Sequence, residues 1–183
     1  MAESMETPFH MFRAGEFFMY TLWLQSQMAD FLILNKDRTL VEERMNDSSR
    51  IPPRMVKARV QYVHKNFDIV LTEFKKVFKK VLSCADVCDL AKIRLLRDMI
   101  AHSHVSVERQ FLLHSPNHQN KLEHIKRQFE LEEIPNQSDP PQLILDFGNN
   151  ERFLNDFELI KRIDEDCFVR VAKHVGISHS RVR

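Results

Sequence analysis

The segment Arg97-Asp98-Met99-Ile100-Ala101-His102 brings together three residue types that act on phosphate groups. An arginine guanidinium is planar and always charged, so it can hold a phosphate through its fork of N–H donors. An imidazole can move a proton near neutral pH. A carboxylate beside the arginine can orient either partner. Arg97, Asp98 and His102 are therefore the candidate catalytic residues, and His104 is an accessory candidate as a second proton carrier.

The surroundings of this segment separate it from other arginine–histidine pairs in the chain. The same separation occurs at Arg59 and His64 and at Arg109 and His114. Only Arg97 is followed directly by a carboxylate, and only His102 follows a small residue at the end of a clear helical pattern. Context, and not spacing alone, therefore selects this segment.

The positions of Arg97 and His102 set a condition on the backbone. An ideal helix places residues five apart about 140° from each other around its axis. The two side chains can converge only if the helix ends or distorts near His102, or if a second chain brings its own copy alongside.

The composition predicts a mainly helical protein. The chain has 183 residues, which fits one domain spanning 1–183, and an apolar fraction of 43% is enough for a hydrophobic core. It has only three glycines, and its long stretches rich in Leu, Lys, Glu, Phe and Met favour helices.

Apolar spacing predicts four long helices. They cover about residues 9–35, 54–82, 84–104 and 150–174. Pro52 and Pro53 suit the entry to the second helix, Ser83 suits the cap of the third with Asp86 near its start, and Gly176 suits the end of the last.

Residues 105–148 break this pattern and are interpreted as an insertion between the third and last long helices. Alternating apolar residues from Val105 to Leu113 predict a strand, and Leu143 to Phe147 form a second candidate. The stretch from Lys121 to Glu133 is ambiguous. The insertion is expected to hold a small antiparallel sheet.

Cysteine and histidine usage predicts no metal centre. An odd number of cysteines and no signal peptide fit a reducing cytoplasm, and polar residues inside the most apolar segment argue against a membrane span. Cys84 and Cys88 are expected to be small buried residues. His114, His118 and His124 cluster in the insertion without matching Cys or carboxylate spacing, so a metal site there is the weaker interpretation.

The net charge of +1 identifies no partner, but the charges are distributed unevenly. Residues 54–80 are mostly basic and residues 130–166 mostly acidic. The basic stretch and the tail provide candidate RNA-binding residues: Lys75, Lys76, Lys79, Lys80, Arg181 and Arg183. The alternative is two solvated faces that attract each other.

The helix order and the Arg-Asp-x-x-x-His segment resemble the HEPN superfamily. That family has a helical bundle bearing an arginine, a polar residue and a histidine four to six residues past the arginine, and Arg97, Asp98 and His102 match these positions. The resemblance covers roughly residues 9–104 and 150–174. It implies a HEPN-like bundle of four to five helices.

The resemblance also implies a function. Many family members are metal-independent endoribonucleases that act as homodimers, often in toxin–antitoxin or phage-defence systems with an antitoxin or regulatory partner. A subset carries a tyrosine two places after the histidine as the target of nucleotide transfer. Here that position is His104, so tyrosine-directed modification is not expected.

Two functions from different classes remain open. The first is an endoribonuclease needing no cofactor, in which His102 is the acid or base, Arg97 stabilises charge on the phosphate and the products carry a 2′,3′-cyclic phosphate. The second is a catalytically inactive helical dimer that binds RNA or a protein, in which Arg97, Asp98 and His102 form a structural network.

Overall fold

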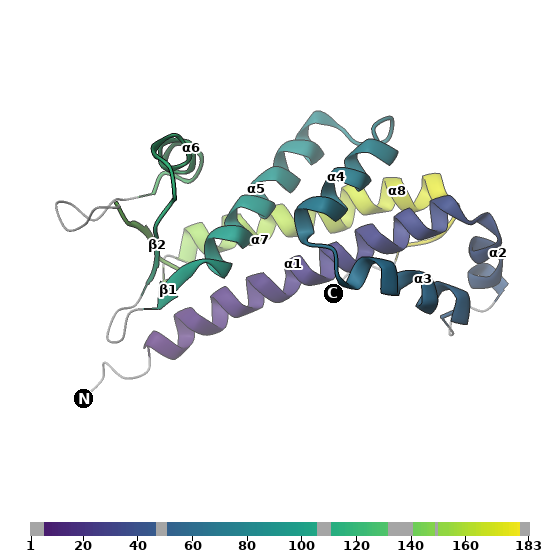
Figure 1. The fold of residues 1–183 in the computed structure, drawn as a ribbon, viewed down its shortest axis with the longest axis horizontal. Helices are drawn as coiled ribbons and strands as arrows, with labels where there is room; N and C mark the ends of the chain where they lie inside the picture. Colours follow the sequence, from purple (N-terminus) through teal and green to yellow (C-terminus); the bar gives the residue numbers. More distant parts are fainter. Residues whose placement is uncertain (1–5, 47–50, 106–110, 132–140, 149, 180–183) are drawn as a thin grey trace. The chain divides into compact units, whose positions relative to one another are not determined.

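The computed structural model describes residues 6–46, 51–105, 111–131, 141–148 and 150–179. Within these residues the fold is mainly helical with one three-stranded antiparallel sheet, as the sequence predicts. The chain forms two compact units (Figure 1). Unit 1 comprises Met1–Met19 and Lys92–Glu158, and unit 2 comprises Tyr20–Ala91 and Leu159–Arg183.

The described helices divide the chain more finely than the apolar spacing predicts. They are α1 (Glu6–Lys36), α2 (Arg38–Asn46), α3 (Pro53–Val63), α4 (Phe67–Val77), α5 (Cys84–Ala101), α6 (Gln119–Phe129), α7 (Asn150–Arg162), a π-helical turn (Ile163–Cys167) and α8 (Phe168–Val175). The boundaries between the two units fall inside α1, α5 and α7. None of the described helices is both long enough and apolar enough to cross a membrane.

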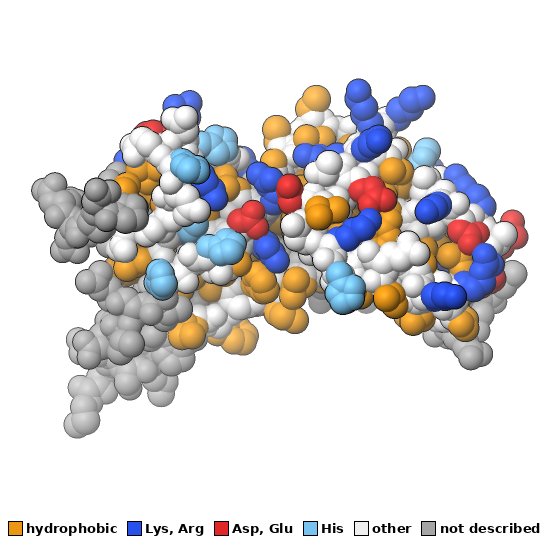
Figure 2. Space-filling model, in the orientation of Figure 1, with side chains coloured by type: hydrophobic (Ala, Val, Ile, Leu, Met, Phe, Trp, Pro, Cys, Tyr) orange, Lys and Arg blue, Asp and Glu red, His pale blue; other side chains and the backbone are white. Residues whose placement is uncertain are grey.

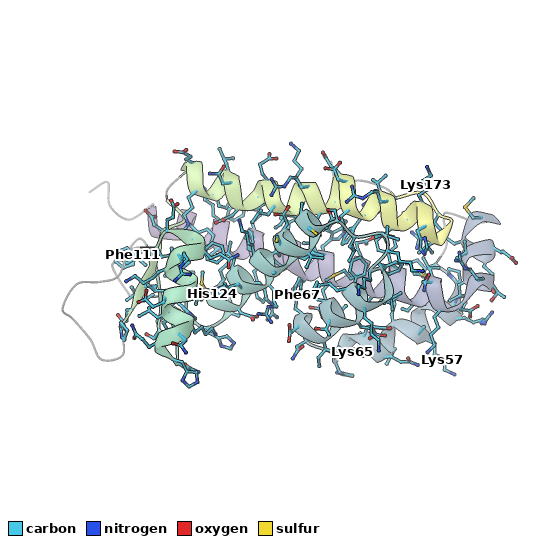
Figure 3. The ribbon with its side chains drawn as sticks, turned by 90° about the horizontal axis from the view of Figure 1, so that it is seen from above. Lys57, Lys65, Phe67, Phe111, His124 and Lys173 are labelled. Atoms are coloured by element: carbon cyan, nitrogen blue, oxygen red, sulfur yellow. The ribbon has the colours of Figure 1, made fainter. Side chains whose placement is uncertain are left out.

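Unit 1 contains the sheet. Strand β1 (Ser103–Val105) pairs with β2 (Leu112–His114), and β2 pairs with β3 (Leu143–Leu145), both antiparallel. Helix α6 lies beside these strands (Figures 1 and 3) and buries Leu122 and Ile125, so the ambiguous stretch is helical from Lys121 to Phe129. The predicted small antiparallel sheet is confirmed, and it begins at Ser103, two residues after the end of α5. The prediction of a single strand from Val105 to Leu113 is wrong, because Val105 ends β1 and pairs with Leu112 of the antiparallel strand β2.

The part of α1 in unit 1 packs through aromatic rings. Phe17 is fully buried and meets Phe157 edge to face, with ring centroids 5.8 Å apart. Arg13 donates to the carbonyl of Phe147 at 2.9 Å, and its guanidinium lies 4.7 Å from the ring centroid of Phe153. These contacts tie α1 to α7 and to the residues that follow β3.

Unit 2 corrects the prediction of one helix over residues 54–82. The chain leaves the helical path after Val63, and Asn66 caps α4 by accepting a hydrogen bond from the backbone N–H of Ile69 at 2.9 Å. Apolar residues continue at helical spacing across the break, from Val60 and Val63 of α3 to Phe67 of α4, which is why periodicity alone missed it. Helix α2 was also missed.

The core of unit 2 is aromatic. The rings of Trp23, Phe31 and Phe168 surround the imidazole of His179, which contacts the buried carboxylate of Asp164. The last helical stretch is α7, the π turn and α8, and it ends at Gly176 with a left-handed φ of 95°, as predicted. Figure 3 shows Lys57 on α3 and Lys173 on α8 within this unit.

Two cysteine predictions are wrong. Cys84 and Cys88 are exposed and free, because they occupy the outward face of the first turns of α5; Cys167 is the buried one. Burial raises the pKa of the Cys167 thiol to about 12, so this residue is an inert part of the core.

Candidate active site

The site begins where α5 ends. The backbone N–H of His102 donates to the carbonyls of Asp98 at 3.1 Å and Met99 at 3.3 Å, a shared bond typical of a helix terminus. The Ser103 hydroxyl donates to the Met99 carbonyl at 2.5 Å. The helix therefore ends at Ala101, and His102 lies in the turn that follows it, with its backbone N–H still bonded to the last helical carbonyls.

Arg97 is held within unit 1 by a carboxylate and a ring. Its Nη1 lies 3.2 Å from Oδ1 of Asp98, and its guanidinium carbon lies 5.2 Å from the ring centroid of Phe18. The side chains of Arg97 and Asp98 are 20% and 35% exposed. The Nε of Arg97 is buried and has no hydrogen-bond partner among the described residues, so one donor of the fork is uncommitted.

The two candidate imidazoles face solvent. His102 and His104 are both exposed, and His104 lies in β1 opposite Leu113. Figure 2 shows histidine side chains gathered over this part of unit 1. The segment therefore has an exposed imidazole at His102 and a partly exposed guanidinium at Arg97, the side-chain types that proton transfer and charge stabilisation at a phosphodiester need.

The histidines of the insertion have different environments. His114 lies in β2 and is 3% exposed, whereas His118 and His124 are exposed at the start and along the length of α6 (Figure 3). Among the described residues, no three side chains of metal-ligand type lie close enough to hold an ion. The burial of His114 was not foreseen from the sequence, because it depends on strand pairing.

Unit 1 also contains a buried carboxyl group whose pKa is raised. Asp156 on α7 is buried, and desolvation raises its pKa to about 6 against the opposing effect of Arg152, whose Nε is 3.9 Å away. A carboxyl that titrates close to neutral pH is a candidate functional group. Its sequence signal was weak, since an Arg-x-x-x-Asp pair also occurs in ordinary helices.

The candidate RNA-binding lysines belong to unit 2. Lys75 and Lys76 lie in the last turn of α4 and Lys79 and Lys80 follow it. Figure 2 shows Lys and Arg side chains gathered at this end of α4. Arg181 and Arg183 lie outside the described residues.

Comparison with known protein families, curated proteins and solved structures finds no match to this chain. The case for a function therefore depends on the residues and their geometry.

Proposed function

We propose that this protein is a metal-independent endoribonuclease of HEPN type. The observation that carries the proposal is the end of α5, where a guanidinium paired with Asp98 and the exposed imidazole of His102 occupy one short segment. Helix α5 ends at Ala101, and a common substrate for the two side chains, five residues apart, is part of the proposal.

The reaction uses the substrate's own 2′-hydroxyl. His102 accepts the hydroxyl proton while O2′ bonds to phosphorus, and the bond from phosphorus to O5′ breaks as that oxygen gains a proton from the protonated imidazole of His104, the accessory proton carrier. Arg97 stabilises the charge on the phosphoryl oxygens, and Asp98 orients Arg97. The products are a 2′,3′-cyclic phosphate and a 5′-hydroxyl, so DNA is not a substrate.

The active form is proposed to be a homodimer. One face of α1 in unit 1 exposes Met11, Phe12 and Met19, which are 50%, 67% and 63% exposed. Gly15 lies on the same face, and a Cβ there would meet nothing within 4 Å. An apolar helix face that is exposed among the described residues, with a glycine within it, suits close packing against a second helix.

The proposed setting is a toxin–antitoxin or phage-defence system, which the resemblance of the Arg97–His102 segment to the HEPN family supports. A neutralising antitoxin or regulatory protein is then an expected partner. The lysines at the end of α4 are proposed to contact RNA phosphates, with the salt dependence that such contacts bring.

The second candidate is an inactive dimer that binds RNA or a protein. The low exposure of Arg97 and its contacts with Asp98 and Phe18 favour it, because such contacts also stabilise a helix end without any reaction. An electrophoretic shift of RNA without cleavage would support this candidate.

The test is cleavage of a random-sequence RNA pool in the presence of EDTA. His102→Ala and Arg97→Ala are each expected to lower the rate by roughly 100-fold or more, since each removes a group that acts in the transition state. His124→Ala is the matched control, because His124 is an exposed imidazole of the same unit on α6. Circular dichroism verifies that the variants fold. Equal cleavage by all four proteins, or cleavage that EDTA abolishes, would contradict the proposal.

A further inference from the structure

Unit 2 contains a small cavity lined by residues of α1, of α2 and of the segment that follows α8. Its volume is about 230 Å³, below the range of about 300–1,000 Å³ that is typical of sites for drug-sized ligands. The lining residues are Trp23, Gln27, Asp30, Phe31, Arg44, Ile177, Ser178 and His179. A space of several water volumes with both aromatic and polar walls suits a small organic ligand.

The imidazole of His179 forms a fixed part of the cavity wall. Its Nε2 contacts Oδ1 of Asp164, and the two side chains are 4% and 5% exposed. An ionised carboxylate can only accept a hydrogen bond, so Nε2 is the donor. The rings of Trp23, Phe31 and Phe168 pack around the imidazole, with centroids 6.3, 6.0 and 5.8 Å from its own. The wall at this point is therefore held from several sides before a ligand binds.

The charges of the lining favour an anion. Asp30 is matched by Arg59, because its two oxygens lie 2.7 Å from Nε and 2.6 Å from Nη2 of that arginine. Arg44 has no carboxylate partner among the described residues, and its one hydrogen-bond contact there runs from Nη1 to Sδ of Met55 at 4.0 Å. A thioether sulfur is a weak acceptor, so most donors of the Arg44 guanidinium remain for a ligand.

We propose that this cavity is a binding site for a small aromatic carboxylate, whose carboxylate pairs with Arg44 and whose ring packs against Trp23 and Phe31. A guanidinium offers two parallel N–H donors that match the two oxygens of a carboxylate, and aromatic rings attract one another in offset or edge-to-face contact. Gln27 and Ser178 add hydrogen-bonding groups to the lining.

The same observations disfavour other anions. One guanidinium matches a single negative charge better than the two charges of a phosphate, and a cavity of about 230 Å³ has no room for a nucleic-acid strand. The site belongs to unit 2, whereas Arg97 and His102 belong to unit 1. The inference therefore does not depend on the proposed function.

The chain has one tryptophan, which gives the test a signal from the cavity itself. In heteronuclear NMR spectra of the isotope-labelled full-length protein, the single indole N–H peak belongs to Trp23. Benzoate is expected to shift this peak saturably, with a Kd on the order of 1 mM. Benzamide has the same ring without the charge, and acetate has the charge without the ring. Each is expected to bind roughly tenfold or more weakly than benzoate.

Variants of Arg44 test the charged contact. Arg44→Gln is expected to weaken benzoate binding by roughly tenfold or more, and Arg44→Lys, which keeps the charge but not the fork, by less. Lys57→Gln is the matched control, because it removes one positive charge at an exposed position of unit 2 outside the lining. Circular dichroism verifies that the variants fold.

Three results would overturn the proposal: a Trp23 peak that benzoate does not shift, equal binding of benzoate and benzamide, or an Arg44→Gln variant that folds and binds benzoate like the wild type. The comparison of benzoate with benzamide uses the wild-type protein alone, so it decides the charged contact even if a variant fails to fold. RNA cleavage plays no part in these measurements.

Discussion

At the scale of single residues, the central feature is a guanidinium whose donors are only partly used. Asp98 accepts a hydrogen bond from Nη1 of Arg97, and the ring of Phe18 lies against the guanidinium. The guanidinium is therefore oriented before a phosphate binds. An oriented donor set loses less entropy on binding than a free one, and it stabilises developing charge without rearrangement. This geometry depends on the planar shape of arginine.

Arg97→Lys tests that dependence. A lysine keeps the positive charge but provides a point charge instead of a fork, so we expect kcat/KM for RNA to fall by roughly tenfold or more. Arg127→Lys is the matched control, because Arg127 is an exposed arginine of the same unit on α6. An Arg97→Lys variant as active as the control would show that charge alone is sufficient.

His114 gives a prediction about stability. Its pKa in the folded protein lies below the ordinary value of 6.5, so the unfolded chain binds the proton more readily. The contribution of this neutral imidazole to stability is therefore lost as the pH falls below about 6.5. In urea titrations, His114→Phe should lose less stability than the wild type between pH 7 and pH 5 (roughly the window in which an unperturbed histidine titrates). A parallel loss in both proteins would argue against a buried neutral His114.

At the scale of elements, α5 is defined at both ends by short polar contacts. Its start is a capping box in unit 2: Asp86 accepts from the backbone N–H of Ser83 at 2.6 Å, and the Ser83 hydroxyl accepts from the backbone N–H of Asp86 at 3.1 Å. Arg170 donates to both oxygens of Asp86 at 2.7 Å. Burial raises the pKa of Asp86, but the bonds from Arg170 and Ser83 outweigh it and the net shift is downward.

Asp86→Asn should weaken this end of the helix. We expect a loss of about 1–3 kcal/mol in the free energy of unfolding at pH 7, because the charged pair and one capping bond are lost. Since the pKa of Asp86 is lowered in the folded state, the difference between variant and wild type should shrink as the pH falls below about 4. Glu42→Gln, at an exposed position of the same unit, is the control. A difference that is constant with pH would contradict the ionic part of this account.

The elements also show what the sequence predicts and what it does not. Ser83, Asp86 and Gly176 have local signals, and the predicted cap and stop are confirmed. The break between α3 and α4, where Asn66 caps α4, was missed because apolar spacing continues through it. His114 was seen as a metal candidate only, since its burial follows from a strand register that local patterns do not specify.

At the scale of the whole molecule, the two units contain different parts of the proposed function. The residues proposed for chemistry and the apolar face of α1 belong to unit 1, and the lysines at the end of α4 belong to unit 2. Residue types in the sequence were enough to propose both the catalytic candidates and the RNA-binding lysines. The sequence did not predict that these two sets belong to different compact units, because helices α1, α5 and α7 each contribute residues to both units.

Met19→Glu tests the proposed dimer. A carboxylate on the apolar face of α1 would have to be buried in the contact, so sedimentation velocity should show a shift toward monomer, and RNA cleavage should fall with it. Met45→Glu is the matched control, because Met45 on α2 is 64% exposed and Met19 is 63% exposed. Equal association of the two variants would exclude this face as the dimer contact.

The most direct test of the nuclease is the chemistry of the ends that it leaves on RNA. The wild-type protein is incubated with a random-sequence RNA pool in EDTA, and the fragments are analysed by mass spectrometry. Attack by the 2′-hydroxyl, with Arg97 and His102 in the roles given above, predicts 2′,3′-cyclic phosphate and 5′-hydroxyl ends. Fragments with 3′-hydroxyl and 5′-phosphate ends, or RNA that stays intact, would contradict it.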